Sequence, residues 1–109
     1  MSNLTFTEKA WEDYLYWQMT DKNIIRKINE LLKDIQRNGI SRGTGKPEPL
    51  KYRKAWSRRI NHEHRLVYMQ DENGALVILS LKGHYEYQAV MPSQKIRDSK
   101  TIAKIVLTK

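Results

Sequence analysis

The 109-residue chain contains no cysteine. Disulfide bonds, a thiolate nucleophile and a cysteine-based zinc site are therefore excluded. The sequence also has no apolar stretch near the ~20 residues that a membrane-spanning helix needs, and it shows no signal-peptide pattern. From these absences we expect a cytoplasmic protein without a membrane partner. Its length provides for one domain with a modest hydrophobic core.

Acidic residues are scarce in the middle of the chain. Residues 39–68 contain eight Lys and Arg residues and two acids, whereas residues 1–38 contain six residues of each sign. Glu48 is the only acid in residues 39–62. Because phosphate contacts dominate nucleic-acid affinity, this middle segment predicts a surface that binds a polyanion. A generic basic surface with no such partner fits the composition equally well.

The order of the predicted elements is helices first, then strands. A first helix should follow Thr7, which is a suitable N-cap. A second helix should begin after Thr20 or Asp21, because isoleucine and leucine then recur with helical spacing. The pair Asn38-Gly39 is a typical C-terminal signal and should end this second helix.

After the helices the pattern changes to that of strands, expected at residues 50–53, 55–61, 64–70 and 75–82. A short extended segment around Leu4 and Phe6 precedes the first helix. Glycine and proline make residues 43–49 irregular. Alternation along 55–61 places Arg58 and Arg59 on opposite faces of their strand. We predict an α+β domain in which two N-terminal helices pack on a twisted antiparallel β-sheet.

The C-terminal segment, residues 87–109, differs from the preceding chain. It is basic, and Pro92 interrupts it. A short helix capped by Ser93, with Val106 on its apolar side, and a flexible tail are both compatible with the sequence. We therefore divide the chain into a domain at 1–86 and a basic C-terminal extension at 87–109.

The basic segment and the residues after it contain the groups needed to cleave RNA without a metal. Such cleavage needs a base for the 2′-hydroxyl proton, an acid for the leaving 5′-oxygen and cations for the added negative charge. Glu48 is the candidate base, and His84, after the last strand, is the candidate acid. Arg59 and Arg65 could bind phosphate oxygens. Tyr85 could stack on a base.

Each of these residues also has a plain structural interpretation. Glu48 could pair with a neighbouring lysine, and a histidine at a strand end is structural more often than catalytic. His62 and His64 could chelate a metal from one face, but no further ligands accompany them, so a turn is the simpler interpretation. The residues alone leave RNA binding and RNA cleavage both open.

Several segments resemble the YoeB/Txe branch of the RelE/ParE toxin superfamily, the ribosome-dependent mRNA interferases of bacterial toxin–antitoxin systems. The resemblance covers residues 4–86, nearly the whole predicted domain. Its most specific parts are GKPEPLK at 45–51, WSRRI at 56–60, EHRLVY at 63–68 and the closing His84-Tyr85 pair.

This resemblance implies a compact microbial-ribonuclease-like fold of the RelE type and cleavage of mRNA in the ribosomal A site. It implies no metal and no other cofactor. By motif match, Glu48 is the general base, His84 the general acid, Arg65 the transition-state arginine and Tyr85 the terminal active-site tyrosine. The candidate phosphate- or RNA-binding residues are Lys46, Lys51, Arg58 and Arg59.

The resemblance also implies partners. These are a cognate antitoxin of the YefM/Axe type, the bacterial ribosome with its mRNA, and a second copy of the chain, since members of the family form homodimers. One departure is that the family typically ends near the His-Tyr pair, whereas this chain continues to residue 109. The alternatives are a non-catalytic relative directed at DNA gyrase, as in ParE-type proteins, and a basic RNA-binding module.

Overall fold

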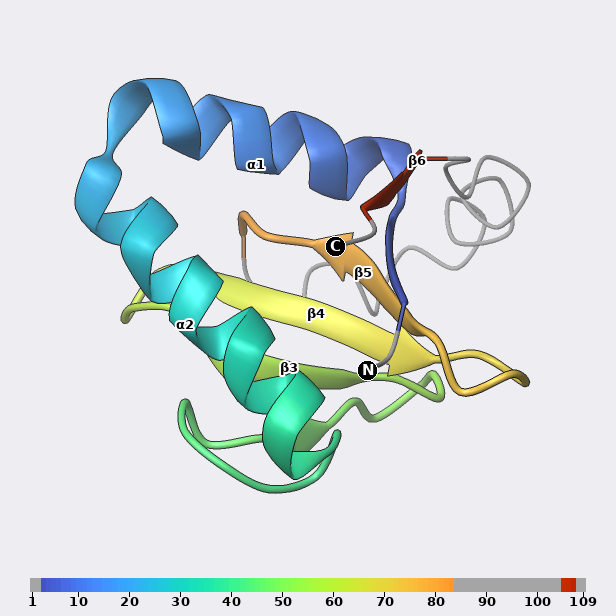
Figure 1. The fold of residues 1–109 in the computed structure, drawn as a ribbon. Helices are drawn as coiled ribbons and strands as arrows, with labels where there is room; N and C mark the ends of the chain where they lie inside the picture. Colours follow the sequence, from blue (N-terminus) through green and yellow to red (C-terminus); the bar gives the residue numbers. More distant parts are fainter. Residues whose placement is uncertain (1–2, 84–104, 108–109) are drawn as a thin grey trace.

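The computed structural model describes residues 3–83 and 105–107, in which two helices cover one face of a six-stranded sheet (Figure 1). The strand order is β2-β3-β4-β5-β1-β6. Strand β1 pairs with β5 in parallel, and the other neighbours are antiparallel. The predicted α+β class with two N-terminal helices is confirmed. The sheet is mixed and not antiparallel throughout as predicted, because β5 runs parallel to β1 beside it. The strands are β1 (Leu4–Phe6), β2 (Glu48–Pro49), β3 (Trp56–Arg59), β4 (Arg65–Gln70), β5 (Leu76–Ser80) and β6 (Ile105–Leu107).

Both helices begin and end at the residues that provide caps. Helix α1 (Glu8–Thr20) follows Thr7, whose hydroxyl oxygen accepts the backbone N–H of Ala10. Helix α2 (Lys22–Asn38) follows Asp21, whose carboxylate accepts two first-turn N–H groups, so Asp21 rather than Thr20 is the cap. Gly39, at φ 95°, ends α2 as predicted.

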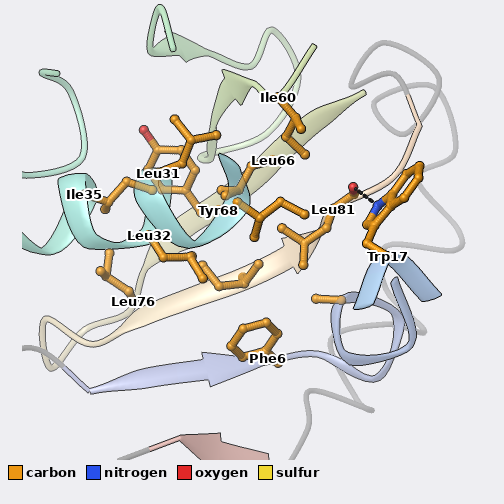
Figure 2. Packing of buried hydrophobic residues seen from close by; sticks show 13 residues of the cluster. Phe6, Trp17, Leu31, Leu32, Ile35, Ile60, Leu66, Tyr68, Leu76 and Leu81 are labelled. Atoms are coloured by element: carbon orange, nitrogen blue, oxygen red, sulfur yellow. Dashed lines mark hydrogen bonds between the residues drawn. The ribbon is translucent and has the colours of Figure 1, made fainter. Parts of the chain in front are cut away.

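The main core lies between the helices and the sheet (Figure 2). Leu31 and Ile35 of α2 pack there with Leu66 and Tyr68 of β4 and with Ile78 of β5, all at most 2% exposed. Full burial of an aliphatic side chain of this size contributes about 1.5–3 kcal/mol. This core fixes α2 against the sheet and leaves the opposite face of the sheet for other groups.

A smaller apolar cluster lies on that opposite face, which we call the outer face. It contains Val67, Val77 and Leu79, covered by Leu50 and Ala55 from the segment between β2 and β3. The pairing of β4 with β5 shifts register between Val67 and Tyr68. The shift changes the alternation of β5, so Ile78 and Leu81, three residues apart, both lie in the main core.

The predicted strand at 50–53 is wrong. Those residues form a turn, closed by the Leu50 N–H donating to the Ala55 carbonyl at 2.9 Å. The strand at this position is instead β2, inside the segment that we expected to be irregular. Proline is tolerated there because β2 is at the edge of the sheet, where the missing N–H removes no ladder bond from a central strand.

Part of the C-terminal extension joins the sheet. Strand β6 pairs with β1 in antiparallel register, with Thr5 opposite Val106. Val106 is therefore in a strand and not on the short helix that was one of the two expectations. The remaining residues of the extension lie outside the described part of the chain, and the division at residue 86 stays a prediction.

Candidate active site

Three adjacent strands bring the candidate base and the candidate transition-state arginine together on the outer face. Glu48 of β2 is opposite Ser57 of β3, and Ser57 is opposite Val67 of β4. Arg65 lies two residues before Val67 and therefore on the same face. Its Nη2 donates to Glu48 Oε1 at 3.0 Å, and its Nε donates to Ser57 Oγ at 3.1 Å.

The two members of this ion pair differ in exposure. The Glu48 side chain is 49% exposed, whereas that of Arg65 is 8% exposed. A ligand on the outer face can therefore reach the carboxylate directly, with the guanidinium held beneath it by Ser57. A carboxylate that accepts a proton beside a cation that stabilises negative charge is a suitable arrangement for phosphodiester cleavage.

Three further cationic residues are exposed on segments next to Glu48 in the sequence or the sheet. Arg59 is exposed and is opposite Arg65 in the β3–β4 pairing. Lys46 and Lys51 are exposed on the segments that enter and leave β2. Part of the positive charge predicted from composition thus lies exposed on the segments that flank Glu48 and on the adjacent strand β3.

The loop before Glu48 has unusual backbone geometry. Lys46 has φ 53°, a left-handed conformation that non-glycine residues seldom adopt and that is found preferentially at functional sites. Gly45 has φ 83°, and a Cβ there would lie 2.9 Å from Leu31 Cδ2. Its carbonyl accepts the Arg59 N–H at 2.7 Å. The loop is therefore fixed tightly against α2 and β3 before it delivers Glu48.

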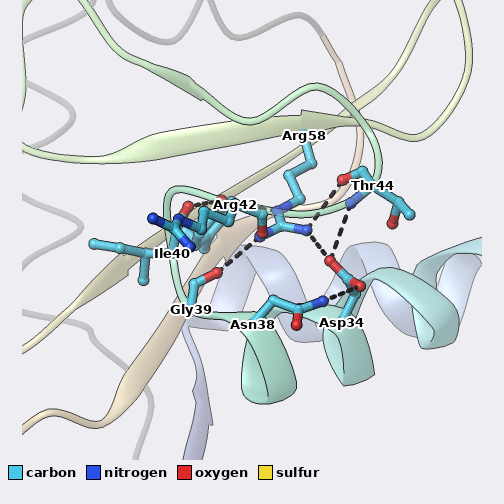
Figure 3. Close-up of polar contacts among 8 residues, drawn as sticks. Asp34, Asn38, Gly39, Ile40, Arg42, Thr44 and Arg58 are labelled. Atoms are coloured by element: carbon cyan, nitrogen blue, oxygen red, sulfur yellow. Dashed lines mark hydrogen bonds and ion pairs between the residues drawn. The ribbon is translucent and has the colours of Figure 1, made fainter.

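Arg58 holds the start of this loop and does not face solvent (Figure 3). Its side chain is fully buried, and its five N–H groups all have protein acceptors. Nε donates to the Tyr68 hydroxyl, and Nη1 donates to Asp34. The remaining acceptors are the carbonyls of Gly39, Arg42 and Thr44. The prediction that Arg58 binds RNA is therefore wrong: the residue fixes the loop from the core side.

The charge of Arg58 affects the pKa values of two of its partners, Asp34 and Tyr68. Burial would raise the pKa of Asp34, but hydrogen bonds from Arg58, the Thr44 N–H and Asn38 outweigh burial and hold this pKa below its usual value. Burial raises the pKa of Tyr68, and the nearby Arg58 charge opposes that rise. Tyr68 also donates to the Ile40 carbonyl, so the pair of the buried Arg58 and the partly exposed Asp34 extends into a network along the loop.

His84 and Tyr85 lie outside the described residues, but the backbone that leads to them is anchored. The Arg65 N–H donates to the Gly83 carbonyl at 3.1 Å. Asp13 accepts the Leu81 N–H, and the Trp17 indole donates to the Leu81 carbonyl, both at 2.9 Å. The anchoring roles of Asp13 and Trp17 were not predicted from the sequence. The only available signal was a carboxylate and an indole on the face of α1 that packs on the sheet.

The two histidines of the β3–β4 connection serve a turn, as expected. Asn61 Oδ1 accepts the N–H groups of Glu63 and His64, both at 2.8 Å, and His62 is exposed. Among residues 3–83 and 105–107, no group of three or more histidines and acids could hold a metal ion. Neither helix in this part of the chain is long and apolar enough to cross a membrane.

Comparisons with known proteins agree with the geometry. Residues 6–85 match the family described as the YoeB-like toxin of bacterial type II toxin-antitoxin systems. The chain is 52% identical to Toxin YoeB of Escherichia coli K12 over 84 residues, which is 75% of this chain and 98% of the relative. The YoeB dimer from Staphylococcus aureus superposes with TM-score 0.72 at 53% identity, covering 77% of this chain and 98% of that one. The YoeB-YefM complex from Staphylococcus aureus gives 0.70 at 54%, covering 78% and 99%.

Proposed function

This chain belongs to the family of YoeB-like toxins of bacterial type II toxin–antitoxin systems, and we propose that it acts as an endoribonuclease on mRNA in the ribosomal A site. The observation that carries the proposal is the ion pair of Glu48 and Arg65, whose carboxylate is half exposed on a cationic face. A surface that only binds RNA has no chemical need for a carboxylate at its centre, because that charge weakens phosphate binding.

The proposed reaction uses the 2′-hydroxyl of the RNA as nucleophile. Glu48 takes its proton, and the 2′-oxygen forms a bond to the adjacent phosphorus. Arg65 and Arg59 stabilise the negative charge that grows on the phosphate oxygens. The bond to the 5′-oxygen breaks as His84 donates a proton to it. The products are a 2′,3′-cyclic phosphate and a 5′-hydroxyl, and no metal or other cofactor takes part.

The remaining candidate residues have supporting roles in this proposal. Lys46 and Lys51 bind the RNA backbone on either side of the scissile phosphate, and Tyr85 stacks on a base. The ribosome supplies what a single carboxylate lacks, since it holds the 2′-hydroxyl in line with the scissile bond. The substrate is mRNA on translating ribosomes, so the proposal places the active toxin in the cytoplasm.

Two protein partners belong to the proposal. The YoeB-YefM complex from Staphylococcus aureus supports a YefM-type antitoxin as the neutralising partner. The YoeB dimer from the same organism supports a homodimer as the assembly of the free toxin. Both relatives exceed half identity with this chain over most of their length, which makes similar interaction surfaces the simplest expectation.

Primer extension on a defined mRNA in bacterial ribosomes tests the proposal. The wild-type chain should cut only in the A-site codon, and only when ribosomes are present. Glu48→Gln keeps the shape and removes the base, so its cleavage rate should fall by about 100- to 10,000-fold. Glu63→Gln, at an exposed glutamate of the β3–β4 turn, is the matched control and should cut like the wild type.

Two results would contradict the proposal. Full cleavage by Glu48→Gln would remove Glu48 from the role of base. Intact mRNA with the wild-type chain, together with inhibition of DNA gyrase in a supercoiling assay, would favour the non-catalytic alternative. The same intact mRNA on ribosomes without gyrase inhibition, together with binding of naked RNA that depends steeply on salt, would favour a basic RNA-binding module.

A further inference from the structure

His64 has a polar contact that its place in a turn does not explain. Its Nδ1 accepts the backbone N–H of Gly83 at 3.0 Å. An imidazole nitrogen that accepts a hydrogen bond carries no proton, so the proton of the neutral ring is on Nε2. The ring also packs edge-on against Trp17, with centroids 4.8 Å apart and planes at 69°. The orientation of His64 is thus fixed from two sides.

Gly83 is a position at which such a restraint has a large effect. Its φ is 98°, and glycine has a wider range of backbone conformations than any other residue. Gly83 directly precedes His84, the proposed acid. Its N–H is held by the His64 side chain and its carbonyl by the Arg65 N–H. Two consecutive residues at the start of β4 therefore fix both polar groups of this glycine.

The same strand start carries the transition-state arginine. Arg65 directs its side chain to Glu48 on the outer face while its N–H holds Gly83. Arg65, which pairs with the proposed base Glu48, therefore also holds the backbone residue that directly precedes His84. Trp17 extends the restraint, because its indole donates to the Leu81 carbonyl (Figure 2). Its ring also contacts the His64 ring.

We propose that His64 is a positioning residue for the cleavage reaction. By accepting the Gly83 N–H, it fixes the backbone from which the acid His84 extends, relative to Arg65 and Glu48. This inference rests on the proposed function, and it assigns His64 no proton transfer and no contact with RNA. A displacement of about 1 Å of a reacting group is enough to lower a rate about 100-fold.

Three variants separate the acceptor from the bulk of the ring. His64→Leu removes the acceptor. His64→Asn is close to leucine in size and places an amide oxygen near the position of Nδ1. His62→Leu is the matched control, because His62 is an exposed histidine of the same turn. Single-turnover cleavage on programmed ribosomes measures the rate and the apparent KM of each variant.

His64→Leu should lower the cleavage rate by about 10- to 100-fold and leave the apparent KM nearly unchanged, because binding cations are retained. His64→Asn should recover most of that loss, and His62→Leu should show none. A loss that is equal in the Leu and Asn variants would overturn the inference, as would a His64→Leu variant with the wild-type rate. If His64→Leu does not fold, His64→Gln replaces it, because its longer amide does not place the oxygen near Nδ1.

Amide hydrogen exchange at Gly83 provides a readout that needs no cleavage. The Gly83 N–H should exchange faster in His64→Leu than in the wild type and His64→Asn, with the exchange of the β4 amides unchanged. Unchanged protection in His64→Leu would overturn the proposed restraint. If the wild type leaves mRNA intact while Gly83 depends on His64 as expected, the proposed function fails and the hydrogen bond alone stands.

Discussion

Arg58 and Arg65 are on adjacent strands and have opposite uses. Arg58 lies on the core face of β3, fully buried, with its five N–H groups bound to protein acceptors. Arg65 lies on the outer face of β4 and holds a carboxylate that is half exposed. The first arginine fixes the loop that delivers Glu48, and the second lies beside Glu48, where the proposed reaction would use it. A basic segment of sequence therefore contains both scaffold and site.

The two arginines differ in the protein groups that compensate for the removal of their charge from water. Burying a guanidinium is costly unless a counter-charge and a full set of acceptors accompany it. Asp34 supplies the charge, and the loop carbonyls supply most of the acceptors. The loop is thereby ordered by the arginine that it surrounds. Arg65 is nearly fully buried as well, but its counter-charge, Glu48, is half exposed.

The largest effect in this comparison is expected on stability at the core face. Arg58→Met should lower the free energy of unfolding by about 3–5 kcal/mol, because it leaves Asp34 without its counter-charge and removes the guanidinium that donates to three loop carbonyls. Urea denaturation followed by circular dichroism measures it. Arg59→Met is the matched control at the neighbouring exposed arginine and should change stability by about 0.5 kcal/mol or less. Similar losses in both variants would remove the distinction between the faces.

A smaller effect on stability is expected at Gly45, where the loop before Glu48 packs against Leu31 and Arg58. Gly45→Ala and Gly74→Ala both place an alanine at positive φ, 83° and 86° respectively. A Cβ at Gly45 would contact Leu31 and Arg58, whereas nothing lies within 4 Å of one at Gly74. Gly74→Ala should cost about 1–2 kcal/mol for the backbone alone. Gly45→Ala should cost more, and equal melting temperatures would show that the loop is not fixed by its packing.

The smallest effect on stability is expected far from both arginines, at strand β1, which β6 covers. The Thr7 N–H donates to Ile78 of β5, so by alternation the amides of Leu4 and Phe6 point to β6. Deleting residues 105–109 should speed hydrogen exchange at Leu4 and Phe6 and leave Thr7 protected. Global stability should change by about 1 kcal/mol or less, because the strand is short. Unfolding on deletion would show that the extension is part of the domain.

Much of the fold could be predicted from the sequence, because its signals are local. The caps Thr7, Asp21 and Gly39 and the spacing of α2 each specify structure within a few residues. The mixed sheet could not be predicted in this way, because the pairing of β1 with β5 joins segments some 70 residues apart. Strand β2 was missed because a two-residue strand with a proline has no periodic signal.

The candidate site was predictable in part. The resemblance selected both Glu48 and Arg65, and the structure places them in contact, whereas their catalytic roles stay predictions. Arg58 was misassigned because charge alone suggested solvent, although it shares a strand face with Trp56, which packs on the main core. The hydrogen bond between His64 and Gly83 spans 19 residues. It depends on how the start of β4 lies against the segment after β5, so no local sequence pattern predicts it.

The most direct test of the central claim is the single-turnover cleavage rate of Arg65→Lys on programmed ribosomes, at a temperature where the variant is folded. Lysine keeps the charge and loses the planar fork that holds Ser57 and Glu48 together. The account predicts a rate lower by about 100-fold or more with the native circular dichroism spectrum retained. A rate within about threefold of the wild type would contradict it, because a point charge would then serve as well as the fork of the guanidinium.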